Sequence, residues 1–104
     1  PAPEGLYFDR QGQPITTLRG FIRAIQSDRI VAQSEPCGPD GPLVSTVFLP
    51  INHAFMGGPP LIFETMVFGG RLDQEQMRYA TEEQARVGHE DMILRVRAVE
   101  GEIA

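Results

Sequence analysis

The sequence has a single cysteine and no long hydrophobic run. Cys37 has no second cysteine with which to form an intrachain disulfide, and no apolar stretch approaches the ~18 residues that a membrane-spanning helix requires. Residues 1–5 also lack the basic and apolar regions of a signal peptide. We therefore expect a cytoplasmic protein that does not associate with membranes.

Lysine is absent, and all nine basic residues are arginine. Fourteen acidic residues are scattered along the chain and give it a formal net charge of −5, which disfavours nonspecific binding to nucleic acids. With 41% apolar and 22% charged residues, the composition is that of an ordinary folded domain. A chain of 104 residues is long enough for one hydrophobic core, so residues 1–104 are expected to form a single domain.

The common catalytic and metal-binding signatures are missing as well. The chain contains no HExxH motif, no CxxC pair and no GxSxG nucleophile motif. Gly57 and Gly58 are followed by two prolines in place of the Lys and Ser or Thr of a phosphate-binding loop, and proline has no N–H with which to bind an anion. We therefore assign no catalytic residue, no metal and no cofactor.

The hydrophobic pattern predicts an α+β domain. Residues 6–15 place turn-forming residues between apolar pairs, which is typical of a β-hairpin. The apolar spacing that begins at Leu18 is that of an amphipathic helix, with Thr16 or Thr17 available as N-cap. The full prediction is an antiparallel sheet of about four to six strands with two helices and an N-terminal hairpin. The elements are a helix at 17–28, strands at 29–34, 43–49, 61–68 and 76–80, and an amphipathic C-terminal helix at 82–99.

The C-terminal helix is expected to have two different apolar faces. Thr81 to Gln84 matches a capping box, and His89 falls on the broader apolar face, which should pack on the sheet. Gly88 lies in the middle of the helix, where glycine is unfavourable, so we expect a neighbouring group to approach closely there. The opposite face carries an apolar stripe of Val87, Leu94 and Ala98.

Glu64 is the one carboxylate inside the apolar segment 61–68. Burying an unpaired charge costs several kcal/mol, so we expect Glu64 to contact a histidine or backbone N–H donors. The chain has two histidines, His53 before this strand and His89 on the last helix. A cluster of His53, Glu64 and His89 would be either a buried polar network or a ligand or metal site. In such a network, Glu64→Ala and His89→Ala are expected to be non-additive in stability.

Four segments of the sequence together carry a resemblance. They are VSTVFL at 44–49, HAF at 53–55, GPPLIFETMVF at 58–68, and the stretch from RYAT at 78–81 to GHE at 88–90. Together these segments resemble the sequences of a group of small uncharacterised proteins of bacteriophages, prophages and high-GC bacteria. The resemblance implies a phage-related setting and no catalytic roles.

These observations favour a small acidic accessory protein that binds a protein partner or forms a homodimer. The candidate interaction residues are Phe55 and Met56 in a loop, and the stripe of Val87, Leu94 and Ala98. The competing hypothesis is a ligand- or metal-binding protein, or a hydrolase, that uses His53, Glu64 and His89.

Overall fold

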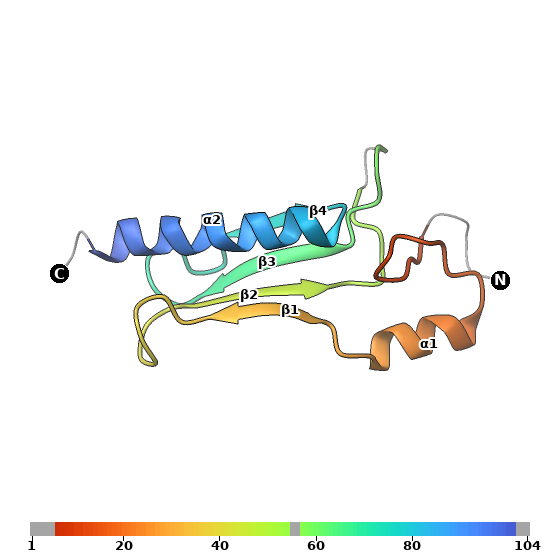
Figure 1. Ribbon diagram of the computed structural model, residues 1–104, viewed down its shortest axis with the longest axis horizontal. Helices are drawn as coiled ribbons and strands as arrows, with labels where there is room; N and C mark the ends of the chain where they lie inside the picture. Colours follow the sequence, from red (N-terminus) through yellow and green to blue (C-terminus); the bar gives the residue numbers. More distant parts are fainter. Residues whose placement is uncertain (1–5, 55–56, 102–104) are drawn as a thin grey trace.

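The computed structural model of the chain describes residues 6–54 and 57–101. Its four strands form one antiparallel sheet in the order β1-β2-β3-β4, and the long helix α2 lies along this sheet (Figure 1). The predicted α+β fold, an antiparallel sheet with two helices, is confirmed. In chain order the elements are α1 (Leu18–Gln26), β1 (Ile30–Ser34), β2 (Leu43–Phe48), β3 (Phe63–Phe68), β4 (Gln76–Tyr79) and α2 (Glu82–Gly101).

The N-terminus of α2 is fixed by side chains, much as the sequence predicts. The Thr81 hydroxyl accepts a hydrogen bond from the Gln84 backbone N–H at 3.1 Å, as an N-cap does. The Gln84 side chain reaches back and accepts from the Ala80 N–H, one residue earlier than in a standard capping box. Glu82 and Glu83 occupy the first turn, where carboxylates interact favourably with the helix dipole.

The core lies between α2 and one face of the sheet, and it has two apolar clusters. Successive strand residues point to opposite faces, and the residues facing α2 on β2 and β3 are all buried. One cluster lies near the beginning of α2 and contains Phe8, Phe48, Ile62, Phe63 and Ala85. The other lies further along the helix and contains Val44, Val67, Met92, Ile93 and Val96.

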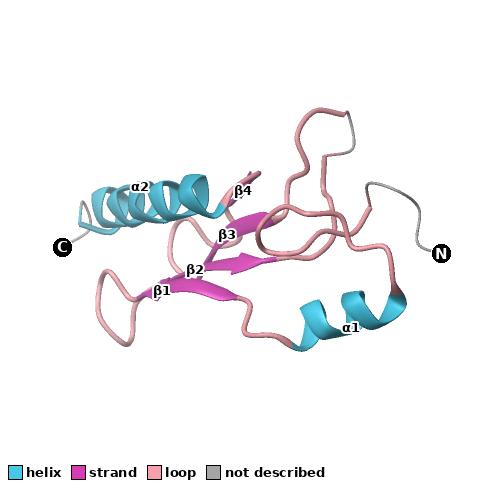
Figure 2. Ribbon diagram, turned by 45° about the vertical axis from the view of Figure 1, so that its right-hand side comes forward, coloured by secondary structure: helices cyan, strands magenta, loops and turns pink. Residues whose placement is uncertain are grey.

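The second face of the sheet has no helix packed against it within the described residues. Five apolar residues lie there, and two of them, Ile30 and Phe68, are each 48% exposed. Because α2 packs on the other face, this side of the sheet remains open to solvent (Figure 2). The remaining apolar residues on this open face are Leu43, Val47 and Met66.

Helix α1 is an arm beside the sheet and not part of its core. Thr17 caps it by accepting from the Gly20 N–H at 3.0 Å, which confirms one of the two predicted N-caps. None of its nine residues is buried, and the structure extends 53 Å along its longest axis (Figure 1). Neither helix in the described part of the chain has a stretch long and apolar enough to cross a membrane.

The predicted N-terminal hairpin is reduced to isolated bridges. Phe8 pairs with Pro14, and Tyr7 pairs with Ile51 from the segment after β2, so residues 6–15 bridge in two directions. Proline has no N–H to donate to a strand ladder, which limits the pairing to a single bridge at that position. The turn still matters for packing, because it carries Phe8 into the core cluster near the start of α2.

Candidate functional site

A row of polar side chains crosses the core between the two apolar clusters. His89 of α2 is 2% exposed, and its Nδ1 lies 2.7 Å from the Thr46 hydroxyl oxygen on β2. Its Nε2 lies 2.9 Å from the hydroxyl oxygen of Ser34 at the end of β1. The Thr46 hydroxyl in turn lies 2.5 Å from that of Thr65, its partner in register on β3. This polar row links α2 to three strands.

The polar row is satisfied by a neutral imidazole. A neutral histidine donates from one ring nitrogen and accepts at the other, and each hydroxyl can do either, so a complete chain of donors and acceptors exists. Burial lowers the pKa of His89, with Glu90 nearby acting in the opposite direction. No carboxylate bonds to the ring within the described residues, so the buried cation has no counter-ion to stabilise it.

The Ser34–His89 contact has the pairing of a nucleophile and a base, but its surroundings suit a structural role. Activated serines need a third group that orients the imidazole and a space in which the substrate carbonyl can sit. Here Thr46 orients the ring, whereas neither Ser34 nor His89 lines the hollows described beside α1, β1 and the α2–β4 edge. We therefore interpret the polar row as a device that fixes strand register in the core.

The pH dependence of stability provides a test of the buried, neutral His89. Folding lowers the pKa of His89 from its ordinary value of 6.5. At a pH just below 6.5, His89 therefore binds a proton in the unfolded chain but not in the folded chain. The free energy of unfolding is therefore expected to be at its plateau above pH 6.5 and to fall as the pH drops from 6.5 toward about 5. Most carboxylates titrate only below this range, so they contribute little to the slope. Urea unfolding across this range should show a slope that His89→Gln removes and that the matched variant His53→Gln keeps. Equal slopes in the two variants would contradict the assignment.

Glu64 lies on the opposite face of the sheet from His89, so the predicted cluster does not form. The Glu64 side chain is 14% exposed, and its Oε2 accepts from Arg78 Nε at 3.0 Å. The carboxylate is mostly shielded from solvent, as the sequence-based expectation requires, but its partner is an arginine and not a histidine. The reason is register: Arg78 on β4 is directly opposite Glu64, while the neighbouring Thr65 points toward α2.

His53 belongs to the segment between β2 and β3, where its backbone N–H donates to the Leu61 carbonyl. Among residues 6–54 and 57–101, no group of three or more His, Cys, Asp or Glu side chains is arranged to hold a metal ion. The ligand or metal site built from His53, Glu64 and His89 therefore has no geometric support.

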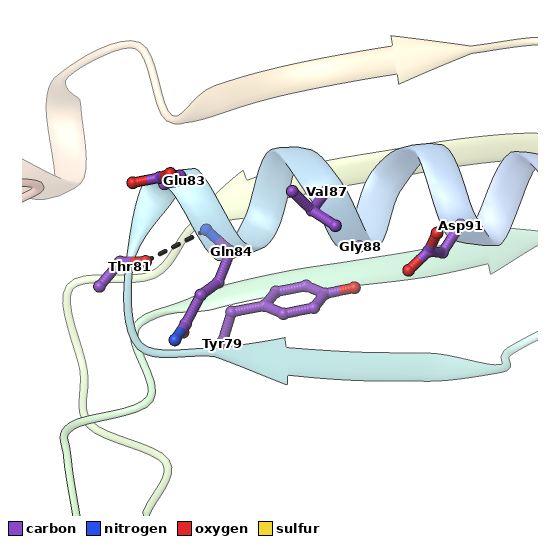
Figure 3. Close-up of a pocket in the computed structure, with 7 residues that line it drawn as sticks. All are labelled: Tyr79, Thr81, Glu83, Gln84, Val87, Gly88 and Asp91. Atoms are coloured by element: carbon purple, nitrogen blue, oxygen red, sulfur yellow. Dashed lines mark hydrogen bonds between the residues drawn. The ribbon is translucent and has the colours of Figure 1, made fainter.

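A groove of about 580 Å³ lies between α2 and the edge strand β4. Figure 3 shows the Tyr79 ring lying along α2 at Gly88, as the prediction of a close approach at this glycine requires. The Tyr79 hydroxyl is buried and has no hydrogen-bond partner among the described residues. A second hollow of about 240 Å³ shares Tyr79, Gly88 and Asp91 with the first. The residues that line the larger hollow are Tyr79, Thr81, Glu83, Gln84, Val87, Gly88 and Asp91.

The predicted apolar stripe on α2 borders this groove and is open to solvent. Val87 is 59% exposed and Leu94 is 63% exposed, and Ala98 is also exposed. The carboxylates of Glu83, Glu90 and Asp91 flank the stripe on the helical projection. They form no ion pair or side-chain hydrogen bond with any described residue. We call the surface made of Val87, Leu94, Ala98, Glu83, Glu90 and Asp91 the acidic stripe.

A second exposed apolar surface lies on α1 and was not predicted. The sequence pattern places Leu18, Phe21, Ile22 and Ile25 on the apolar side of an amphipathic helix, but Leu18, Ile22 and Ile25 are 74%, 44% and 37% exposed. The helix instead touches the domain by its margin, where Phe21 packs against Tyr7 and Ala24 packs against the Phe8 cluster. We call Leu18, Ile22 and Ile25 the α1 apolar face.

Phe55 and Met56, predicted as interaction residues, lie outside the described residues.

The sequence-based prediction did not include Ser34, Thr46 and Thr65. The threonines occupy strand positions in phase with buried valines and phenylalanines, and this polar break in an inward-facing apolar row is a signal that points to a buried network.

Comparisons of the chain with protein-family models, with curated proteins and with solved structures found no match.

Proposed function

We propose that this protein is a small acidic accessory protein that acts by binding another protein chain, either a foreign partner or a second copy of itself. The observation that carries the proposal is the α1 apolar face. An amphipathic helix normally buries its apolar side, whereas α1 turns Leu18, Ile22 and Ile25 to solvent. Exposed apolar patches of this kind commonly mark interaction sites.

A hollow of about 470 Å³ supports the proposal, because it connects the α1 apolar face to the open face of the sheet. It is lined by Ile25 at the end of α1 and by Ile30 and Val47, which are partners in register on β1 and β2. The apolar surface is therefore not confined to one helix. A phage-related setting, as the sequence resemblance implies, fits such a protein, since no enzymatic machinery is required of it.

The proposal predicts that a charge on the α1 apolar face removes association without unfolding the protein. Leu18→Glu/Ile22→Glu is expected to change the free energy of unfolding by about 1 kcal/mol or less, because both side chains are exposed in the monomer. Ala24→Glu, on the inward side of the same helix, should cost about 1–3 kcal/mol because it places a charge against the Phe8 cluster.

The measurements are urea unfolding at low protein concentration, sedimentation velocity at high concentration, and affinity purification of the tagged protein from its natural host. The wild type should associate with itself or retain a protein that the double variant loses. The proposal fails if the double variant is as unstable as Ala24→Glu, because the α1 apolar face would then belong to the monomer core. Unchanged association in a stable double variant would also refute it.

A further inference from the structure

We propose that the occupant of the acidic stripe is helix α1 of a second copy of this chain, so that two copies form a reciprocal dimer. This inference rests on the proposed function and specifies the partner. Its first support is charge. Helix α1 carries Arg19 and Arg23 beside its apolar face and contains no acidic residue, and neither arginine forms an ion pair or side-chain hydrogen bond with a described residue.

The carboxylates of the acidic stripe carry the opposite charge and, like Arg19 and Arg23, form no ion pair with a described residue. Glu83, Glu90 and Asp91 have no cationic partner within the described chain. The basic residues of α2 are engaged elsewhere, since Arg86 pairs with Glu82, Arg95 pairs with Glu75, and Arg97 donates to the Pro36 carbonyl. A basic amphipathic helix therefore meets an acidic rim around an apolar centre, which is the arrangement of a complementary interface.

The apolar centres also match in length. Leu18 and Ile25 are seven residues apart on α1, as are Val87 and Leu94 on α2, so each pair spans about 10 Å along its helix axis. Ile22 lies between the first pair and fits the spacing of a ridge that packs into the groove of a facing helix. The hollow beside Val87, between α2 and β4, offers space for such side chains.

The two surfaces of one chain lie at opposite edges of the sheet. Helix α1 leads directly into β1, whereas the acidic stripe borders β4, the other edge strand (Figure 1). The end of α1 is also held in place, because Arg10 bonds to both the Asp28 carbonyl and the Glu82 carboxylate. In this fold the surfaces meet between two copies, and a two-fold axis uses each surface twice and closes the assembly.

Charge reversal on one side at a time tests the pairing. Arg19→Glu/Arg23→Glu and Glu83→Arg/Asp91→Arg are each expected to raise the dimer dissociation constant at least tenfold, because like charges then face each other. An equimolar mixture of the two variants should dimerise like the wild type, since an acidic α1 then meets a basic stripe and a basic α1 meets an acidic one. Sedimentation velocity measures the association, and unfolding midpoints confirm that both variants are folded. Arg71→Glu and Asp40→Arg, which reverse exposed charges away from both surfaces, are the matched controls.

Restoration in the mixture supports the inference. A wild-type dimer that is indifferent to both reversals overturns it, because self-association then does not depend on the pairing of α1 with the acidic stripe. A wild type that remains monomeric at about 300 µM, well above the dissociation constants of specific complexes, overturns it as well. The Leu18→Glu/Ile22→Glu experiment then decides separately whether the α1 apolar face binds a foreign protein.

Discussion

Replacing His89 by alanine is expected to lower the free energy of unfolding by about 3 kcal/mol, among the larger effects for a single substitution in this chain. The change removes a side chain that is 2% exposed and leaves the Thr46 hydroxyl without one of its two partners. Both an internal cavity and unpaired buried polar groups contribute to the loss. Urea or thermal unfolding measures it, with Val87→Ala on the exposed side of the same helix as the matched control.

A double-mutant cycle locates the origin of this effect. Thr46→Val and His89→Ala should be non-additive by about 0.5–3 kcal/mol, because their side chains share a hydrogen bond at 2.7 Å. Glu64→Ala and His89→Ala should instead be additive within about 0.5 kcal/mol, since Glu64 bonds to Arg78 on the other face of the sheet. This replaces the coupling that the sequence predicts between Glu64 and His89. Additivity of the Thr46 pair would show that the polar row makes no joint contribution to stability.

The effect of Gly88→Ala on stability should change sign when the Tyr79 side chain is removed. A Cβ at Gly88 would overlap the hydroxyl and ring carbons of Tyr79, so Gly88→Ala is expected to cost about 1–3 kcal/mol although alanine is the better helix former. In a Tyr79→Ala background, which itself should cost about 3 kcal/mol, the same substitution should stabilise by up to about 1 kcal/mol.

Two controls accompany the Gly88 experiment. Gly101→Ala introduces a Cβ at the last residue of the same helix with no described atom within 4 Å, so it reports a glycine-to-alanine change that causes no clash. Tyr79→Phe removes a buried hydroxyl that has no partner among the described residues and should leave stability unchanged or slightly higher. If Gly88→Ala is equally destabilising with and without the Tyr79 ring, close approach of the ring is not the reason for this glycine.

The sequence alone determines the features that depend on local spacing. The capping residues Thr17 and Thr81 each accept a hydrogen bond from a backbone N–H three residues away, so the caps can be predicted from a short segment of sequence. The helical period likewise separates the buried side of α2 from the stripe of Val87 and Leu94. Glycine in the middle of a helix indicates a close approach, although the identity of Tyr79 as the neighbour is not visible in the sequence.

Tertiary structure decides which of these surfaces meet. Strand register sets Glu64 opposite Arg78 and Thr46 opposite Thr65, and shifting a strand by one residue would send every side chain to the other face. Because α2 covers only one face of the sheet, His89 lies on that face while Glu64 points to the other. The orientation of α1 is also a tertiary result: the period identifies an apolar side at Ile22, but contacts of Phe21 and Ala24 with the N-terminal turn point that side to solvent. Periodicity specifies that a helix has an apolar face, and only the packing of distant segments determines whether that face is buried or left for a partner.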